Sequence, residues 1–459
     1  MANYYTPGVY VEEISTLPTS VVEGSTAVPA FLGYTEKTEY NGTDRKLVPT
    51  RISTMLEFQQ YFGGPPAPVV TAKAKETTQI VFDGISEYTS SIYTLYYSLD
   101  LFFKNGGNYC YIVSLGGYSS PAKLDKEDFE SGLKALEKED EPTLIVMPDA
   151  CGLDADTYYP ICQEALAQCK RLKNRFCILD VRPADAASDK SAVEIFREKI
   201  VSENLQYGAA YYPFLKTSIS PTIDETKITI TGLNDATTES TLKDIKTKNT
   251  GLYSAIKNEL NNPKYKVVLP ASAAIAGVYA SVDRDRGVWK APANVGLNAV
   301  IEPVTKITAA EQDKLNVDAT SGKSINAIRS FTGKGIIVWG ARTLAGNDNE
   351  WRYVSVRRLF NLIEDSASKA TFFAVFEPND ATTWLKVQSM IDSYLYSLWQ
   401  QGALAGPTAK AAYFVKVGLG STMTTQDILE GRMIIEIGVA AVRPAEFIIL
   451  RFSHKLQEA

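Results

Sequence analysis

Residues 143–181 read TLIVMPDACGLDADTYYPICQEALAQCKRLKNRFCILDV, and they carry the clearest fold signal in the chain. Two short apolar runs, Thr143–Met147 and Phe176–Val181, have the length and composition of buried strands. Between them, Tyr158–Lys173 has the length and spacing of a helix. A strand, a helix and a second strand in this order predict a crossover unit with parallel strands.

The same alternation of strands and helices extends on both sides, from about residue 85 to 282. Further elements are expected at Tyr109–Leu115, Asp125–Glu137, Ser191–Asn204, Ala209–Leu215 and Lys266–Leu269. This pattern predicts an α/β (α+β mixed) fold with a largely parallel sheet. Residues 216–250 break the alternation because they are rich in Thr, Asp and Lys, and we expect a solvent-facing hairpin or loop there.

The rest of the chain adds a strand, a short helix and two long amphipathic helices. Ala27–Tyr34 is predicted to be a buried strand, and Ser53–Phe62 a helix that ends at two glycines. Near the C-terminus, Arg352–Ala367 and Thr383–Gln401 each place their apolar residues on one stripe. These two helices are therefore expected to pack through one face and to expose the other.

Both ends of the chain carry short, strand-prone apolar segments outside any obvious core. They are Val9-Tyr10-Val11-Glu12 and Phe447-Ile448-Ile449-Leu450. Unpaired strands of this kind promote aggregation unless something covers them. Each segment could fold back onto its own chain as an edge strand, or it could pair with a neighbouring copy.

Composition excludes several classes of protein. The chain has 459 residues, and its 47 basic and 53 acidic side chains give a net charge of −6, which argues against direct nucleic-acid binding. Its five cysteines include no Cys-x-x-Cys pair, so free thiols are expected rather than disulfides or a zinc site. No apolar run reaches the length of a membrane span, and no membrane insertion and no secretion signal are expected.

No catalytic, cofactor or metal site is predicted. The single histidine, His454, is five residues from the C-terminus, which disfavours histidine-dependent nucleophilic catalysis. Gly322-Lys323-Ser324 resembles the end of a phosphate-binding loop, but Val317 stands where that motif needs its first glycine. Asp283-Arg284-Asp285-Arg286 is expected to form local ion pairs.

An enzyme remains a distant alternative. It would use carboxylates near strand ends, such as Asp149, Asp154 and Asp180, because α/β folds bind ligands at that edge of the sheet. The other interpretation of these three residues is that they form turns and cap helices.

A series of motifs resembles the sheath proteins of contractile phage tails and phage-tail-like injection systems. The motifs run in family order along the chain and are Tyr5-Thr6-Pro7-Gly8-Val9-Tyr10-Val11-Glu12-Glu13, Phe31-Leu32-Gly33-Tyr34-Thr35, Phe103-Lys104-Asn105-Gly106-Gly107, Gly287-Val288-Trp289-Lys290-Ala291-Pro292-Ala293-Asn294, Val338-Trp339-Gly340-Ala341-Arg342-Thr343, Tyr353-Val354-Ser355-Val356-Arg357-Arg358-Leu359, Phe376-Glu377-Pro378-Asn379, Leu398-Trp399-Gln400-Gln401-Gly402-Ala403-Leu404 and Arg443-Pro444-Ala445-Glu446-Phe447. No single motif is decisive, but together they are specific.

The resemblance implies a domain plan. A conserved inner domain would be formed by both chain ends, here residues 19–84 with 283–445, and residues 85–282 would form an inserted outer α/β domain. The segments 1–18 and 446–459 would be strand-exchange arms that add strands to neighbouring copies. The motif residues of the inner domain would be Trp289, Lys290, Pro292, Asn294, Trp339, Arg342, Arg357 and Arg358.

The resemblance also implies a mechanical function without cofactors. Subunits would stack as six-fold rings around an inner tube, contact baseplate and terminal cap proteins, and contract to drive the tube through a target membrane. The candidate tube-facing surface is the polar side of the two C-terminal helices, with Lys386, Ser389 and Ser393 on the second and Arg357 and Arg358 beside the apolar stripe of the first.

The type of particle is less sharply defined by the resemblance. The modest length favours an extracellular injection particle or a bacteriocin-like tail over the tail of a phage virion, which is the alternative. In either case the particle would assemble in the bacterial cytoplasm, and an injection particle would then be released or membrane-anchored.

Overall fold

The computed structural model describes residues 21–76, 80–185, 188–232 and 240–449. It divides the chain into two compact units. The large unit contains residues 25–364 and the segment that starts at residue 443, and the small unit contains residues 365–442 with the segment that ends at residue 24. Among the helices in these ranges, none has both the length and the apolar character needed to cross a membrane.

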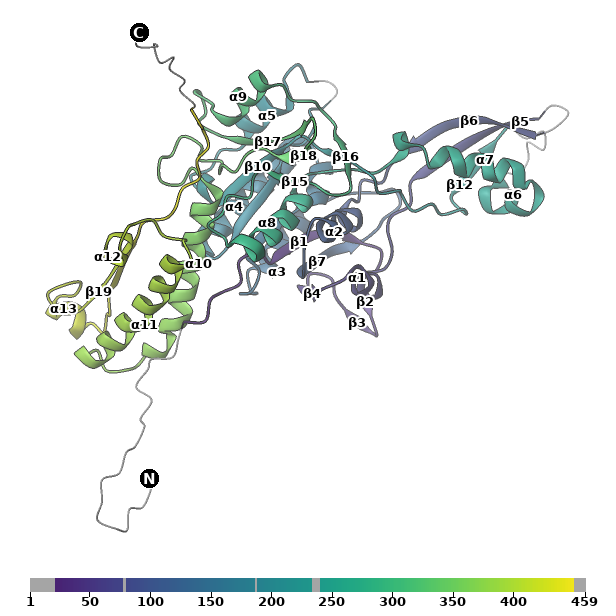
Figure 1. Cartoon of the computed structure of the whole chain (residues 1–459). Helices are drawn as coiled ribbons and strands as arrows, with labels where there is room; N and C mark the ends of the chain where they lie inside the picture. The colour runs from purple at the N-terminus through teal and green to yellow at the C-terminus, as the bar shows by residue number, and fades with distance from the viewer. Residues whose placement is uncertain (1–20, 77–79, 186–187, 233–239, 450–459) are drawn as a thin grey trace, which may run out of the picture. The chain divides into compact units, whose positions relative to one another are not determined.

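A nine-stranded sheet forms the centre of the large unit (Figure 1). Its strands follow one another across the sheet in the order β15 (Val295–Gly296), β18 (Gly335–Val338), β17 (Ile325–Phe331), β10 (Gly208–Tyr212), β9 (Phe176–Asp180), β8 (Leu144–Val146), β1 (Pro29–Thr35), β7 (Cys110–Gly117) and β4 (Thr50–Ile52). The strands from β17 to β7 run parallel, whereas β4 and β18 are antiparallel to their inner neighbours. The predicted mixed α/β class is therefore confirmed.

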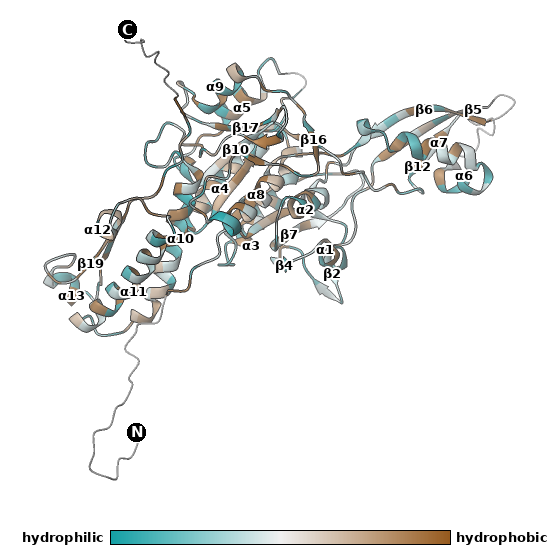
Figure 2. Cartoon of the chain, in the orientation of Figure 1, coloured by the Kyte–Doolittle hydropathy of each residue, from teal (hydrophilic) through white to brown (hydrophobic). Residues whose placement is uncertain are grey.

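Helices cover both faces of this sheet. The helices are α2 (Leu95–Lys104), α3 (Lys126–Leu136), α4 (Ala155–Leu172), α5 (Ala192–Lys199) and α8 (Ser272–Arg286). Leu32 of β1 packs in one buried cluster with α3, α4 and α5, while the adjacent Phe31 packs in another with α2 and α8. Adjacent strand residues face opposite sides of a sheet, so both faces are apolar, and Figure 2 shows the central strands as hydrophobic.

A second, four-stranded sheet replaces the loop that we expected over residues 216–250. It consists of β13 (Ser240–Thr241), β12 (Ile228–Thr231), β5 (Val69–Glu76) and β6 (Ile80–Thr89), and it carries α6 (Leu242–Lys248) and α7 (Thr250–Leu260). Strands β12 and β13 pair antiparallel, so the expected hairpin is present. Ile228 and Ile230 are buried, however, so the expectation that this segment faces solvent is wrong. Strand β12 pairs with β5, which lies far earlier in the sequence, and local composition cannot reveal such a partner.

The large unit also contains several smaller elements. They are β2 (Glu39–Tyr40), β3 (Thr43–Asp44), α1 (Met55–Phe62), β11 (Leu215–Thr217), β14 (Val268–Leu269), β16 (Val300–Pro303) and α9 (Ala309–Asn316). Strands β14, β11 and β16 form a short antiparallel sheet.

The small unit is built from helices and one hairpin. Its elements are the end of α10 (Val354–Thr371), α11 (Ala381–Gln400), α12 (Ala409–Ala412), β19 (Tyr413–Val417), α13 (Thr425–Leu429) and β20 (Ile435–Val439). Helix α11 begins at Ala381, two residues before the predicted start, because Asp380 caps it by accepting a hydrogen bond from the Thr383 N–H at 2.9 Å. It ends before Gly402, whose φ of 84° is a left-handed conformation that favours glycine.

This division differs from the domain plan expected from the sequence. The nine-stranded sheet takes β1, β17 and β18 from the expected inner domain and β7, β8, β9 and β10 from the expected insertion. One sheet therefore combines strands from both sides of the expected boundaries at residues 84 and 282. Strand β1 lies between β7 and β8, and this order across the sheet is not visible in the order along the chain.

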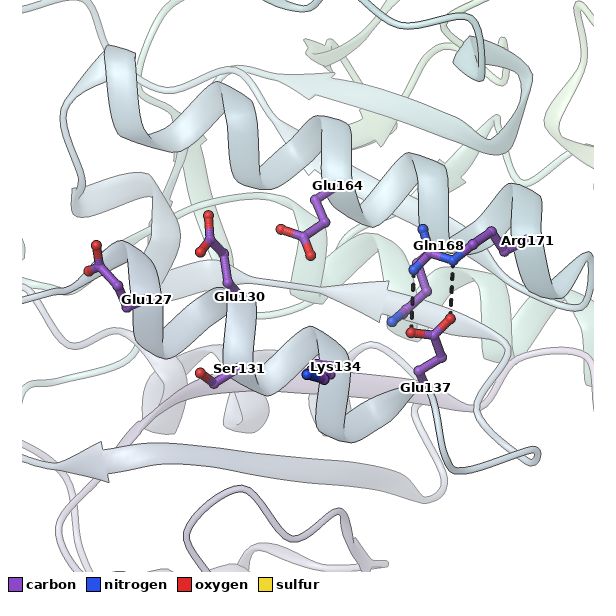
Figure 3. Close-up of a pocket in the computed structure, with 8 residues that line it drawn as sticks. All are labelled: Glu127, Glu130, Ser131, Lys134, Glu137, Glu164, Gln168 and Arg171. Atoms are coloured by element: carbon purple, nitrogen blue, oxygen red, sulfur yellow. Dashed lines mark hydrogen bonds and ion pairs between the residues drawn. The ribbon is translucent and has the colours of Figure 1, made fainter.

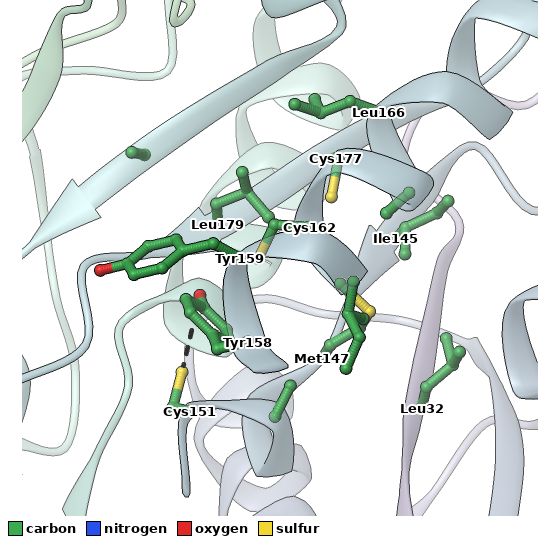
Figure 4. Close-up of a cluster of buried hydrophobic side chains, with 14 of the residues drawn as sticks. Leu32, Ile145, Met147, Cys151, Tyr158, Tyr159, Cys162, Leu166, Cys177 and Leu179 are labelled. Carbon is green, nitrogen blue, oxygen red and sulfur yellow. Dashed lines mark hydrogen bonds between the residues drawn. The ribbon is translucent and has the colours of Figure 1, made fainter. Parts of the chain in front are cut away.

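All five cysteines are buried free thiols. Figure 4 shows Cys151, Cys162 and Cys177 among apolar side chains of the core. Burial raises the pKa of every one of these thiols, to about 12 for Cys162 and Cys169. The native thiols are therefore poorly reactive, which makes introduced cysteines useful as probes.

Candidate functional site

The three aspartates that could have served an enzyme all bind helix N-termini. Asp149 is fully buried, and its Oδ1 accepts hydrogen bonds from Leu95 N at 2.8 Å and from the Thr94 hydroxyl at 3.0 Å, at the start of α2. Its Oδ2 accepts from Tyr34 N at 2.8 Å. Burial raises the pKa of Asp149 to about 6, although these hydrogen bonds oppose the shift.

Asp180 and Asp154 have the same role at two other helices. Asp180 is buried, burial raises its pKa to about 6, and its carboxylate accepts a hydrogen bond from Ser272 N at 2.8 Å, at the start of α8. Asp154 accepts a hydrogen bond from Thr157 N at 2.9 Å and caps α4. The interpretation of these residues as helix caps is thus confirmed.

The Gly-Lys-Ser segment is used within the fold. The Lys323 ammonium donates a hydrogen bond to the carbonyl of Arg197 near the end of α5, and Arg197 Nε donates back to the Lys323 carbonyl at 3.2 Å. Burial lowers the pKa of Lys323. Lys323 thus caps a carbonyl near the C-terminal end of α5. This structural role requires no phosphate.

A pocket between α3 and α4 is lined mostly by acidic side chains and has an ion pair at one end (Figure 3). Glu127, Glu130 and Glu164 line one end, and Arg171 neutralises Glu137 at the other with a contact of 3.1 Å. Burial and the nearby Glu130 raise the pKa of Glu164. In the described ranges, no three His, Cys, Asp or Glu side chains are placed to hold a metal ion.

The motif residues 287–294 form a cap and a turn. Gly287 ends α8 with a φ of 87°, and a Cβ there would lie 2.4 Å from the ring of Trp289. Lys290 donates a hydrogen bond from Nζ to the carbonyl of Ala291 at 3.0 Å. Asn294 donates its N–H to the Val338 carbonyl at 2.8 Å and leads into β15, while Pro292 lies buried in the intervening turn.

Arg357 and Arg358 are buried, so their expected place beside a tube-facing surface is not supported. Arg357 donates to Asn361 and Glu364, each at 2.8 Å, and lies over the ring of Trp351. Arg358 pairs with Asp283 and lies over Tyr279. On α10, the two arginines that were predicted to lie on the polar face are therefore bound to other residues of the same chain.

One ion pair forms within the charge cluster, as predicted, and a second reaches an unexpected partner. Arg284 contacts Asp285 at 3.1 Å on the surface. Asp283 instead turns inward, where it pairs with Arg358 of α10.

The second helix does expose the predicted residues. Lys386, Ser389 and Ser393 lie on the exposed side of α11, opposite the buried Val387 and Leu395. Leu385 and Asp392 are exposed on the same helix, so the face is mixed rather than purely basic.

The C-terminal motif meets an internal motif in a way that the sequence did not indicate. Glu446 accepts hydrogen bonds from Arg342 Nε at 2.9 Å and Nη2 at 2.6 Å, and the Arg342 side chain is only 4% exposed. Immediately afterwards, Phe447, Ile448 and Ile449 are 71%, 80% and 77% exposed. Trp339, in the same motif as Arg342, is partly exposed and packs against Phe331.

The other arm residues lie outside the described part of the chain. These are Leu450 and the whole of Val9-Tyr10-Val11-Glu12.

The small unit contains a two-stranded sheet, β19 with β20, that the sequence patterns had not predicted. Strand β19 pairs antiparallel with β20, from Tyr413 with Val439 to Val417 with Ile435, and no third described strand joins them. The alternation Ile435-Glu436-Ile437-Gly438-Val439 was the available signal. Two strands alone are marginally stable, and neither edge of this sheet is covered by another described strand.

Two family models match most of the chain. The model described as phage tail sheath protein central domain matches residues 122–344, and the one described as phage tail sheath C-terminal domain matches residues 346–455. Among curated proteins, the tail sheath protein of Vibrio phage KVP40 is 24% identical over 77% of this chain, and that of Enterobacteria phage T4 is 24% identical over 40%. The chain spans only 50% and 27% of those two proteins.

Solved structures of similar length resemble the whole chain. A PVC sheath complex of an extracellular contractile injection system, in its contracted state, is 32% identical with a TM-score of 0.66, and the match covers 100% of this chain and 99% of that one. The contracted helical sheath of the anti-feeding prophage is 34% identical with a TM-score of 0.65, over 98% and 100% of the two chains. The chain therefore belongs to the tail sheath family and is a contractile sheath subunit of a phage tail or a tail-like injection system.

Proposed function

We propose that this chain is the sheath subunit of an extracellular injection particle, stacked as six-fold rings around an inner tube. The likeness to the PVC and anti-feeding prophage sheaths covers both chains almost completely and supports this assignment. By contrast, the chain spans only 50% of the KVP40 phage sheath protein and 27% of the T4 one. Two further matches are baseplate structures of the anti-feeding prophage, which supports baseplate proteins as partners. The inner tube and a terminal cap complete the proposed set of partners, and the particle assembles in the bacterial cytoplasm.

Two features of the chain support strand exchange. The β19–β20 sheet has only two strands, and the apolar residues Phe447, Ile448 and Ile449 are exposed. We assign Phe447–Leu450 of one copy as a strand that pairs with the β19–β20 sheet of another. Residues 9–12 are assigned as a second exchanged strand. Pairing would cover the apolar arm and would satisfy the free backbone groups of the sheet edge.

The register identifies β20 as the more open edge. The Ala440 N–H donates to the Ala412 carbonyl, so alternation along the ladder turns the backbone groups of Ile435, Ile437 and Val439 away from β19. The equivalent groups of β19 are partly occupied. The Tyr413 N–H donates to Ala409, and Gln388 of α11 donates to the Val415 carbonyl at 3.0 Å.

Contraction is then a repacking of interfaces between copies that stay linked through their arms. The extended lattice is metastable, and the shorter lattice has the lower free energy. The difference, summed over many copies, moves the tube through a target membrane. This mechanism requires no bound nucleotide, and Asp149, Asp180 and Lys323, which an enzymatic mechanism would have used, are occupied inside the fold.

Disulfide trapping tests the exchange. One preparation carries a cysteine in the arm (Phe447→Cys, Ile448→Cys or Ile449→Cys), and a second carries Glu436→Cys on β20, an exposed position. After assembly from the mixture and mild oxidation, we expect a disulfide-linked dimer in sheaths and none in unassembled protein. The buried native thiols do not compete.

Val69→Cys is the matched control, because it places an exposed cysteine on β5, in a different sheet. The proposed exchange is refuted if none of the three arm positions links to β20, or if all of them link to Val69→Cys equally well.

A phage tail sheath is the second candidate function, favoured by the 24% identity with the KVP40 protein over 370 residues. Electron microscopy of particles purified from the producing cell separates the two. Headless particles support the injection system, whereas DNA-filled heads on the same tails would show a phage.

A further inference from the structure

The backbone of Arg342 is hydrogen-bonded to the nine-stranded sheet. Its backbone N–H donates to Asn326 Oδ1, and its carbonyl accepts from Asn326 Nδ2, both at 2.8 Å. Asn326 is buried in β17, and its amide also donates to the Ala210 carbonyl of β10 at 3.2 Å. The side chain of Arg342 therefore projects from a backbone that is hydrogen-bonded to an inner strand of the sheet.

The carboxylate of Glu446, whose side chain is 22% exposed, accepts hydrogen bonds from several groups of the large unit. Besides Arg342, it accepts hydrogen bonds from Asn316 Nδ2 at 2.9 Å, at the end of α9, and from the Tyr353 hydroxyl at 3.3 Å. A bidentate pair with a guanidinium fixes the orientation as well as the position of a carboxylate. Three residues earlier, Arg443 donates to the Asn349 carbonyl at 2.8 Å.

The contacts stop abruptly after Glu446. Phe447, Ile448 and Ile449 are all largely exposed, although they are the most apolar part of the arm. The family resemblance placed the start of the arm at residue 446, whereas the contacts with Arg342, Asn316 and Tyr353 tie Glu446 to the large unit and the exposed apolar residues start at Phe447.

We propose that the Arg342–Glu446 ion pair is the fixed base of the C-terminal arm, through which a pull from a neighbouring copy passes into the central sheet. This proposal rests on the proposed strand exchange. A bidentate pair that is largely shielded from water resists displacement better than an exposed single contact. The arm then swings from Phe447 during contraction, and residues 443–446 stay bound to their own copy.

The anchoring can be measured in the unassembled chain. Spin labels are attached at Ala445→Cys and at Leu56→Cys, an exposed site on α1. The Ala445 label lies near β17, which binds Arg342, and the Leu56 label lies on α1, which follows β4. These two strands are six strand spacings apart in the sheet, or about 29 Å. We expect a narrow distance distribution in the native background. The width of this distribution should at least double with Glu446→Gln. Tyr353→Phe removes only the longest of the hydrogen bonds to Glu446 and should change the width less.

Arg342→Gln combined with Glu446→Gln guards against a folding defect, because it leaves no unpaired buried charge. If this double variant melts as the native chain does, its label distribution should still be broad. A distribution that stays narrow in both Glu446→Gln and the double variant overturns the proposal.

The consequence for the particle is tested in sheaths. With Glu446→Gln, the disulfide between Ile448→Cys and β20 should still form, but the fraction of sheaths that stay intact through contraction should fall at least threefold. Lys199→Gln is the control, because it removes an exposed ion pair with Asp156 in the same unit. Unchanged intact fractions with Glu446→Gln overturn the proposal. If strand exchange itself does not occur, the disulfide will also be absent in the chain that keeps Glu446, and this result distinguishes the two failures.

Discussion

Arg358 of α10 and Asp283 of α8 form an ion pair whose side chains are only 3% and 4% exposed. Arg358 Nη1 donates to Asp283 Oδ1 at 3.0 Å, and Nη2 also donates to the carbonyl of Thr26 at 2.9 Å. One guanidinium thus joins two helices and the segment that leads into β1. The motif that supplies Arg358 has a structural role at this position.

Breaking this pair should strongly destabilise the protein. Asp283→Asn leaves a buried guanidinium without its carboxylate, and we expect a loss of about 3–5 kcal/mol in the free energy of unfolding. Urea unfolding followed by circular dichroism measures this loss. The control is Asp285→Asn, whose partner Arg284 is exposed, and it should cost less than about 1 kcal/mol. Equal costs for the two variants would contradict the buried-pair assignment.

The buried carboxyls of Asp149 and Asp180 should make the protein more stable at pH 5 than at pH 7. Burial raises both pKa values to about 6, whereas an aspartate in an unfolded chain titrates near 4. The native state therefore binds these protons more tightly, and the stabilisation is present at low pH and lost as the pH rises through 6. Each group should contribute about 1 kcal/mol between pH 5 and pH 7.

The contribution of Asp149 can be isolated by difference. Asp149→Asn turns an amide toward Tyr34 N–H and should cost about 1–3 kcal/mol, with the larger cost at pH 5. Its unfolding free energy should also vary less with pH than that of the native chain. Parallel pH profiles from 5 to 7 would show that Asp149 does not titrate in this range.

Two truncations that differ by two residues should behave differently as monomers. Deletion of residues 448–459 removes most of the exposed arm and keeps Glu446 on Arg342, so we expect native thermal stability and no sheath assembly. Deletion of residues 446–459 also unpairs Arg342 and should cost about 3 kcal/mol. Calorimetry and electron microscopy measure the two effects. Sheaths from either truncated protein would argue against a required C-terminal strand.

The N-terminal arm can be tested in the same way. Deletion of residues 1–18 should leave a cooperatively melting monomer that no longer assembles.

Lys323→Ala should leave assembly and contraction intact. The substitution removes one hydrogen bond to the carbonyl of Arg197, and we expect a cost of about 0.5–1.5 kcal/mol in stability. Contraction should also proceed equally with and without added ATP. Loss of contraction by a variant that folds normally would point to a nucleotide-dependent step.

Local patterns in the sequence predicted most elements of the large sheet. The runs at 143–147 and 176–181 became β8 and β9, and the run at 109–115 became β7, because short β-branched and apolar runs bounded by turns have few other stable conformations. The position of β1 between β7 and β8 depends on contacts distant in sequence. The domain plan implied by the family resemblance consequently assigns strands of this one sheet to two different domains.

The candidate site was predictable only in part, for a related reason. Helical periodicity correctly placed Lys386, Ser389 and Ser393 on an exposed face, but the same reasoning applied to Arg357 and Arg358 did not reveal that Glu364 and Asp283 bind them. Glu446 and Arg342 were each found in a motif, but their pairing joins residues 104 positions apart. A period shows which side of a helix a residue is on, and it does not show what packs there.

Lys386 provides the sharpest test of the proposed tube contact. It is exposed on α11 with Ser389 and Ser393, and the structure gives it no partner in the described residues. A polar contact suits a surface that must grip the tube before contraction and release it afterwards, because breaking it exposes no apolar area. If the tube presents acidic groups there, Lys386→Glu replaces attraction with repulsion. The number of extended sheaths on tubes should then fall, and fall further as salt is lowered and screening weakens.

The contracted lattice no longer grips the tube, so it should be nearly unaffected by Lys386→Glu. Lys410→Glu, at another exposed lysine of the small unit, on α12, should change neither lattice. Electron microscopy of both lattices at several salt concentrations separates the possible roles. Equal damage to extended and contracted sheaths would assign Lys386 to packing between sheath subunits, because that contact alone is needed in both states.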